Sequence, residues 1–196
     1  MEHIHIYAGW AAGIFSLVAY IPYTVSILKK KTQPNRATWI IWTVVSLTML
    51  FSYDAVGANE TIWLLRAFAL GTVITMLLSL KYGTGGWTRF DRGCLITAAV
   101  SLFAWWVFDS PLSALLISLF VDALGSLPTI KKLYHDSESE NKTAWALFFI
   151  GSLSNVIAVN TWTFEIAIHP VIMFTTLSTI FILVFLKPKK LLTLRI

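Results

Sequence analysis

The feature that most constrains this chain is a stretch of sequence that occurs twice. Residues 22–47 and 128–153 align without a gap at an offset of 106 residues. The positions that coincide include Pro22 with Pro128, Asn35 with Asn141, Arg36 with Lys142, Trp39 with Trp145, and Ser46 with Ser152. In an apolar chain, such a repeat predicts two similar halves with any binding site between them.

The composition excludes a soluble domain. The chain is 57% hydrophobic and only 13% charged, and its mean hydropathy is +0.72, which is typical of a protein in a bilayer. Apolar runs long enough for a span of about 20 residues recur along the chain. They lie near 4–28, 37–56, 61–81, 94–109, 112–134, 143–159 and 165–187. Their length and lack of strict alternation predict an all-α membrane protein with seven transmembrane helices rather than a barrel.

The basic residues predict the orientation. Fourteen of the 15 Lys and Arg residues fall on one face of the predicted bundle, in the first, third and fifth loops and in the tail. The positive-inside rule then places the N-terminus outside and the C-terminus in the cytoplasm, and only an odd number of spans permits this. The net charge of +5 therefore reflects topology and contact with the lipid bilayer, not nucleic-acid binding. We expect a multi-pass protein of the plasma (inner) membrane.

The predicted spans group as 3+1+3. A first triple-helix repeat covers 1–82, a linker with the fourth span covers 83–111, and a second repeat with a cytoplasmic tail covers 112–196. The unpaired fourth span gives both repeats the same orientation, so they are parallel. This layout resembles the SWEET and PQ-loop transporter superfamily. The family's Pro-Gln step corresponds here to Pro22-Tyr23 and Pro128-Thr129, so the glutamine is absent from both copies.

The resemblance implies a membrane transporter of a small polar solute, such as a sugar, an amino acid or a small organic anion. Access to the solute would alternate between the two triple-helix bundles. A proline inside a helix removes one backbone hydrogen bond, so Pro22 and Pro128 are candidate hinges, although prolines also simply bend membrane helices. Tyr20 and Trp42 lie near these hinges and are candidates for an inner gate, with core packing as the alternative for Tyr20.

Asp122 stands in the middle of the fifth predicted span. A bare carboxylate at that depth is costly, so it should face the interior and be paired, protonated or solvated. In proton-coupled PQ-loop proteins such carboxylates take the coupling proton, and Asp122 resembles them in its surroundings. The structural alternative is an ion pair with Arg66.

The third helix of each triplet aligns best at an offset of 103 residues, which places Arg66 opposite His169 and Thr72 opposite Thr175. In the SWEET family this region contributes a polar pocket residue. An arginine and a histidine there predict a site for an anionic group. The alternatives are that Arg66 extends to the outer interface and that His169 is a satisfied core residue.

Further candidates lie on the second helix of each triplet. Ser46 and Tyr53 share one face in the first triplet, and Ser152 and Asn155 share the matching face in the second. An amide inside a span needs a partner, because an unsatisfied amide is costly there. Asn155 therefore contacts either a ligand or a neighbouring helix.

Other functional classes remain as alternatives. A SWEET-fold membrane receptor that binds a ligand or a peptide terminus, as in the KDEL-receptor group, would use basic residues in its cavity. A vitamin-precursor carrier similar to the PnuC group would also have seven helices and many tryptophans. No catalytic pair, metal-ligand spacing or cofactor motif stands out, so we expect neither an enzyme nor a metal site. The sequence leaves a homo-oligomer open.

Overall fold

The computed structural model describes most of the chain outside the predicted linker. The described residues are 2–32, 34, 36–83, 110–135, 137 and 141–186, with single residues at 89, 92, 93, 96, 99, 100, 103 and 107. Within them the protein is all-helical, with no strand. The all-α prediction is confirmed for this part of the chain.

The helix bounds follow the apolar runs closely. The helices are α1 (Glu2–Leu28), α2 (Arg36–Ala55), α3 (Ile62–Tyr82), α5 (Pro111–His135), α6 (Lys142–Ile157) and α7 (Phe164–Phe185). Each corresponds to one predicted span. The fourth predicted span, 94–109, lies outside the described residues apart from a few single positions. The number of spans therefore stays a prediction.

The surface of the helices is typical of a membrane protein. Three helical segments are long and apolar enough to cross a bilayer, namely His3–Leu28, Ile62–Tyr82 and Phe164–Phe185, and shorter apolar stretches occur at Trp39–Ala55 and Pro111–Ser126. Large apolar side chains also point outward, for example on α1, α3 and α7 at Ile14, Leu77 and Ile182. A soluble bundle would place charged and polar groups on these outer faces.

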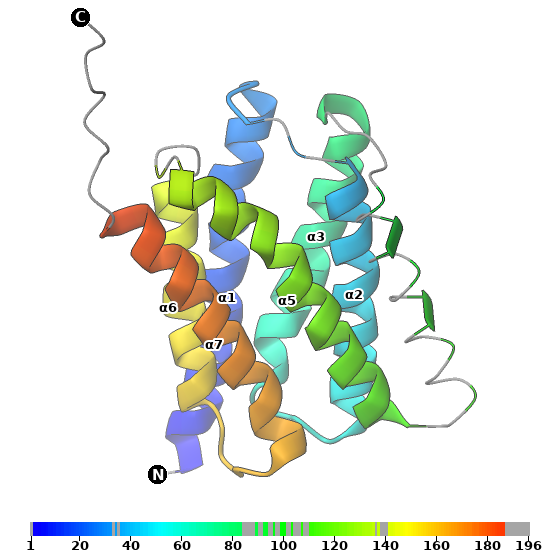
Figure 1. Ribbon diagram of the computed structural model, residues 1–196. Helices are drawn as coiled ribbons and strands as arrows, with labels where there is room; N and C mark the ends of the chain where they lie inside the picture. Colours follow the sequence, from blue (N-terminus) through cyan, green and yellow to red (C-terminus); the bar gives the residue numbers. More distant parts are fainter. Residues whose placement is uncertain are drawn as a thin grey trace, which may run out of the picture.

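The helices form a closed ring. α1 packs against α3 and α6, α2 packs against α3 and α5, and α7 packs against α5 and α6. A smaller contact joins α3 to α6. Following the main contacts leads around the ring in the order α1, α3, α2, α5, α7, α6 (Figure 1). These main contacts between helices have a two-fold pattern. Exchanging α1 with α5, α2 with α6 and α3 with α7 gives the same set of contacts.

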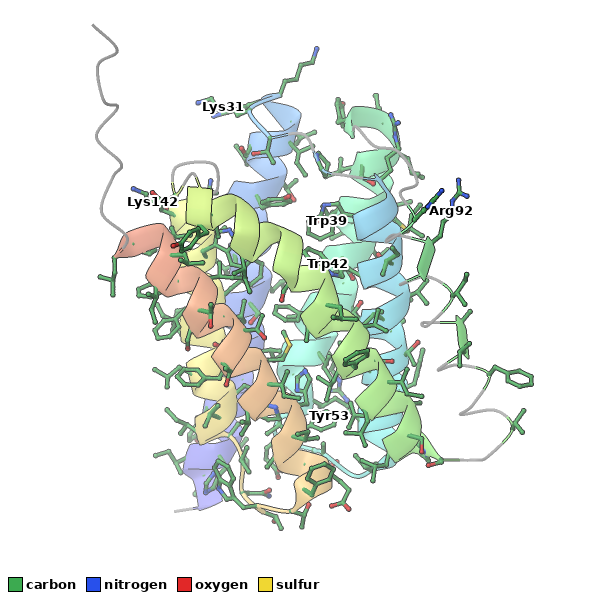
Figure 2. The ribbon with its side chains drawn as sticks, viewed as in Figure 1. Lys31, Trp39, Trp42, Tyr53, Arg92 and Lys142 are labelled. Carbon is green, nitrogen blue, oxygen red and sulfur yellow. The ribbon has the colours of Figure 1, made fainter. Side chains whose placement is uncertain are left out.

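We call α1, α2 and α3 the first triplet and α5, α6 and α7 the second. Corresponding helices of the two triplets run in the same direction. α1, α3, α5 and α7 run toward one end of the ring, and α2 and α6 run away from it (Figure 1). Lys31, Arg92 and Lys142 lie toward that end, whereas Tyr53 lies toward the other (Figure 2). We call the first the basic end and the second the distal end. This separation of charge is what the sequence pattern predicts for the described basic residues.

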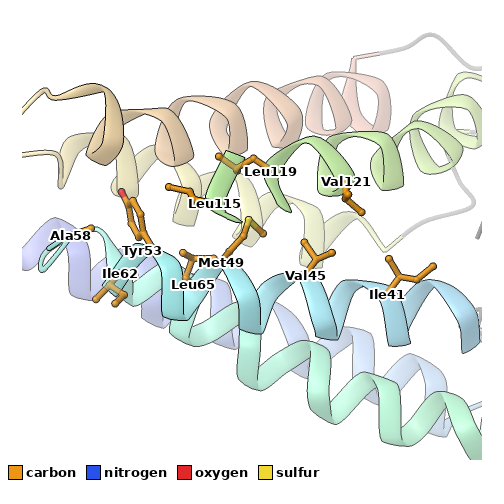
Figure 3. Packing of buried hydrophobic residues seen from close by; sticks show 10 residues of the cluster. All are labelled: Ile41, Val45, Met49, Tyr53, Ala58, Ile62, Leu65, Leu115, Leu119 and Val121. Atoms are coloured by element: carbon orange, nitrogen blue, oxygen red, sulfur yellow. The ribbon is translucent and has the colours of Figure 1, made fainter. Parts of the chain in front are cut away.

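An apolar core joins the two triplets along α2 and α5. Ile41, Val45, Met49 and Tyr53 follow each other at intervals of four residues, which places them on one face of α2. That face meets α5, where Leu115 contributes to the same buried cluster (Figure 3). The other members are Ala58, Ile62, Leu65, Leu119 and Val121. This packing fixes how the two triplets meet on one side of the ring.

Local signals explain two of the helix ends at the basic end. The Asn141 side chain caps α6 by accepting a hydrogen bond from the Ala144 backbone N–H at 3.0 Å, which satisfies one free amide at the helix start. Its repeat counterpart, Asn35, lies outside the described residues. After α1, Lys30 adopts a left-handed backbone conformation with φ of 55°. The Lys31 N–H then donates to the Ser26 carbonyl at 2.9 Å in the manner of a Schellman motif.

Candidate functional site

An aromatic cluster packs between the two triplets. Tyr20 of α1 meets Phe148 of α6 with ring centroids 5.1 Å apart, and it meets Phe68 of α3 at 6.3 Å, both edge to face. Trp39 and Trp42 of α2 pack edge to face at 5.2 Å in the same cluster. Figure 2 shows both tryptophans nearer the basic end than Tyr53. These five residues, referred to below as the aromatic cluster, include both predicted gate residues.

A glycine makes room for the phenol ring of Tyr20. A Cβ atom added at Gly71 of α3 would collide with that ring. The ring therefore lies directly against the α3 backbone, and Tyr20 is only 7% exposed. The absence of a side chain at Gly71 sets the position of this part of the cluster.

Tyr53 connects the two triplets near the distal end. Its hydroxyl donates to the Ile166 carbonyl of α7 and lies 2.8 Å from the Thr61 hydroxyl. Its ring centroid is 5.0 Å from that of His169 on α7. His169 is fully buried, and neither ring nitrogen has a hydrogen-bond partner among the described residues. Two predicted site residues are therefore brought together, one from each triplet.

Asn155 is another fully buried polar residue without a partner among the described residues, as are Ser16 and Ser52. Neither atom of its amide is hydrogen-bonded within the described part of the chain. It lies one turn after Gly151 on the same face of α6. A Cβ atom added at Gly151 would collide with the Ser16 hydroxyl and lie 3.2 Å from the Ala12 carbonyl, both on α1. Asn155 therefore lies on the face of α6 that packs against the other triplet.

The remaining predicted hydroxyls are satisfied. Ser46 of α2 and Thr72 of α3 are buried and their hydroxyl oxygens lie 2.8 Å apart. Both predicted residues belong to the first triplet, so this bond stabilises one triplet internally. Ser152 is fully buried and donates to the Phe149 carbonyl of its own helix at 2.8 Å. All three hydroxyls can still accept a hydrogen bond.

Asp122 lies on the face of α5 that meets the first triplet. Its side chain is half-buried. Gly125 follows it by three residues on the same helix face. A Cβ atom added at Gly125 would lie 2.6 Å from the indole nitrogen of Trp42, so the indole covers this face. The structure thus places Asp122 on the face of α5 that contacts Trp42, and Trp42 belongs to the same cluster as Tyr20.

Arg66 and Thr175 lie away from these groups. Arg66 is exposed on α3, and its guanidinium carbon is 4.6 Å from the ring centroid of Trp63, an arrangement typical of a cation–π contact. Among the described residues it forms no ion pair with Asp122. Thr175 is exposed and donates to the Val171 carbonyl of α7 at 2.8 Å. The structure does not group either residue with His169.

The two predicted hinges differ in what the structure describes. Pro22 lies inside α1, which continues through it to Leu28. The backbone at Pro128 is helical and belongs to α5, but the Pro128 side chain lies outside the described atoms. α7 contains a further proline, Pro170, directly after His169. Each of these prolines removes one backbone hydrogen bond from its helix.

The sequence analysis missed four residues that shape this region, Phe68, Gly71, Phe148 and Gly151. The repeat could have identified Phe148, because it is the counterpart of the predicted gate residue Trp42 at the offset of 106. No comparable signal existed for Phe68, Gly71 or Gly151, because phenylalanines and glycines are frequent in membrane helices. Their importance depends on which helix each one faces.

No protein-family model, curated protein or solved structure matches this chain. The chemistry of the buried groups therefore carries the functional argument.

Proposed function

We propose that this chain is a membrane carrier for a small polar solute that binds between the two triplets. The observation that carries this proposal is the pair Asn155 and His169. Both are fully buried, and within the described residues neither has a hydrogen-bond partner. Burying such groups without compensation costs free energy, so they are retained where a ligand or water satisfies them. Asn155 and His169 are the groups we assign to solute binding.

The ring of helices supports a carrier built from two halves. Its main contacts are the same after exchange of the two triplets, as expected for the parallel 3+1+3 arrangement of seven spans. Sites in such carriers lie between the halves. The buried residues without partners are consistent with this, because His169 contacts Tyr53 of the other triplet and Asn155 faces α1. We place the N-terminus and the distal end outside the plasma membrane and the basic end in the cytoplasm.

The two ends of the ring suggest how access alternates. Toward the basic end, the aromatic cluster fills the space between the triplets and would act as the inner gate. Toward the distal end, the bond from Tyr53 to the Ile166 carbonyl joins the triplets and would act as the outer gate. Rocking of one triplet against the other, with bending at Pro22 and Pro128, would open one gate at a time. Asp122 would take either a coupling proton or a positive group of the solute.

A receptor for a peptide terminus now has less support. That alternative required basic residues inside the bundle, and the predicted basic residue, Arg66, is exposed beside Trp63. The histidine alone does not favour a carboxylate ligand, because both of its neighbours described above, Tyr53 and Pro170, are uncharged. We therefore retain transport as the single proposed function.

Uptake by proteoliposomes tests this function. Purified protein is reconstituted and the initial uptake of labelled sugars, amino acids and small organic acids is measured against empty liposomes. We expect protein-dependent uptake of at least one solute, and its reduction in His169→Phe, which keeps the aromatic ring but removes both nitrogens. The matched control is His3→Phe, at an exposed histidine. Saturable binding without net uptake of any solute would contradict a carrier and favour a receptor.

A further inference from the structure

Asp122 is a half-buried carboxyl group in the middle of α5. The described basic residues on α1, α2 and α3 lie at helix ends or are exposed, as Arg36, Arg66 and Lys81 are. No ion pair to Asp122 occurs among the described residues. A carboxylate in the middle of an apolar helix is expensive unless something positive or polar faces it. The protein keeps this charge at the interface between the triplets.

Aromatic side chains lie on the face of α5 that carries Asp122 and in the cluster next to it. The indole of Trp42 lies on the same face of α5, against Gly125 one turn away. Its N–H is buried and has no acceptor among the described residues. Tyr20 of α1 belongs to the same cluster as Trp42, and its ring is held by Phe148 and Gly71. Asp122 therefore lies on the face of α5 that Trp42 contacts, next to the cluster that contains Tyr20.

This combination of groups recognises positive charge. Aromatic faces attract cations through their quadrupole, and the attraction increases when water is excluded. A carboxylate adds Coulomb attraction that is stronger inside the protein than in water. An anionic solute would meet repulsion here, because Arg66 is not available to compensate. A neutral solute would use the hydrogen-bonding groups but would leave the charge of Asp122 unbalanced.

We infer that Asp122, Tyr20 and Trp42 form a binding site for the ammonium group of a small cationic solute. This inference rests on the proposed transport function, because the site lies between the two triplets that would move. It replaces the anionic solute that the sequence predicted from Arg66 and His169. In this arrangement the ammonium group binds at Asp122, and the polar remainder of the solute extends toward Asn155 and His169.

The test compares cations with neutral molecules of the same shape. Choline is paired with 3,3-dimethylbutan-1-ol, and ethanolamine is paired with propan-1-ol, so that each pair differs only in replacing nitrogen by carbon. The melting temperature of the purified full chain is measured against the concentration of each compound. We expect at least one cation to raise the melting temperature saturably while its neutral partner does not. A neutral partner that stabilises equally, or no response to either cation, would overturn the inference.

Variants then assign the effect to the site. Asp122→Asn keeps the shape and removes the charge, and it should weaken apparent cation affinity by about tenfold or more, since a tenfold loss corresponds to one lost interaction of moderate strength. Trp42→Leu should weaken it by a smaller factor through loss of the aromatic face. The matched control is Asp54→Asn, at an exposed carboxylate near the end of α2, and it should bind cations as the unmodified chain does. Unchanged affinity in Asp122→Asn would overturn the inference.

Uptake measurements separate this inference from the proposed function. A cation that crosses the membrane carries charge, so its uptake into proteoliposomes should increase when a potassium gradient with valinomycin makes the interior negative. If a neutral solute is the one that is transported, its uptake rate changes neither with the membrane potential nor in Asp122→Asn. That result would preserve transport and refute the cation site. Binding of choline through Asp122 without uptake of any solute would preserve the cation site and refute transport.

Discussion

Asn155 and Ser46 show how two buried polar residues on related helices differ in their relation to function. The Ser46 hydroxyl is 2.8 Å from the Thr72 hydroxyl, so its hydrogen-bonding capacity is used within the protein. The amide of Asn155 has no partner within the described residues. A satisfied group stabilises the fold, whereas an unsatisfied one destabilises it and is kept for another reason.

This contrast predicts opposite effects of two substitutions. Asn155→Leu replaces the amide by an apolar group of similar size, so the melting temperature should stay equal or rise while solute uptake falls. Ser46→Ala removes an interhelical bond and should lower the free energy of unfolding by about 0.6 kcal/mol, the average for such bonds in membranes, with uptake largely retained. Thermal unfolding in detergent and uptake by proteoliposomes check both. A destabilised Asn155→Leu variant with normal uptake would show that Asn155 only joins helices.

Arg66 shows why part of the site could not be predicted from the sequence. The alignment at an offset of 103 set Arg66 opposite His169, but the two differ in burial. The buried residues of α7 match those of α3 best at an offset of 105, which pairs His169, Pro170, Leu177, Ile180 and Val184 with Leu64, Leu65, Thr72, Thr75 and Ser79. The register by burial therefore differs by two residues, which rotates a side chain by about 200° around a helix. Hydropathy does not detect this error in helices that are apolar on every side.

At the scale of helices, the sequence predicted the elements well. The apolar runs end at charged residues, prolines or glycines, and these mark the helix ends to within about two residues, as at Arg36, Pro111 and Lys142. The order of helices around the ring was not predicted from the residues. Lipid and protein interior are equally apolar, so a membrane helix carries little pattern that identifies its neighbours. Small residues at close contacts decide the packing, and Gly71 is one of them.

The contact of Gly71 with Tyr20 predicts a specific packing defect. Gly71→Ala places a Cβ atom inside the Tyr20 ring, and overpacking of this kind typically costs about 1–3 kcal/mol. We expect a lower melting temperature and weaker solute binding, because Tyr20 moves away from Asp122. Adding Tyr20→Leu should recover part of the stability, and a double-mutant cycle measures this coupling. Gly93→Ala is the control, since no atom of the described residues lies within 4 Å of its added Cβ. Additive losses in the cycle would contradict the proposed contact.

At the scale of the whole molecule, two hydrogen bonds join the triplets near the distal end. One runs from the Tyr53 hydroxyl to the Ile166 carbonyl, and the other joins the His5 ring nitrogen Nδ1 to the Ile157 carbonyl at 2.9 Å. They connect α2 with α7 and α1 with α6, on two sides of the ring. If access alternates by rocking of the triplets, both bonds must break whenever the distal end opens.

A cross-link at this position therefore predicts loss of transport. The variant His5→Cys/Ile157→Cys is made in a Cys94→Ser background, because Cys94 is the only native cysteine. A short thiol-reactive cross-linker should raise the melting temperature and stop uptake, and a reductant that cleaves the linker should restore uptake. The joined helices belong to different triplets, so the linker opposes the relative motion and not the folding of either half.

The control for this experiment uses a contact within one triplet. The Arg36 side chain donates to the Ser79 carbonyl at 3.2 Å, which joins α2 to α3 in much the same way as His5 joins α1 to α6. Cross-linking Arg36→Cys/Ser79→Cys should leave uptake unchanged, because a triplet that rocks as a rigid body keeps its internal distances. If both cross-links stop uptake, the helices move within each triplet. If neither does, the distal end stays closed during transport, and the rocking mechanism fails.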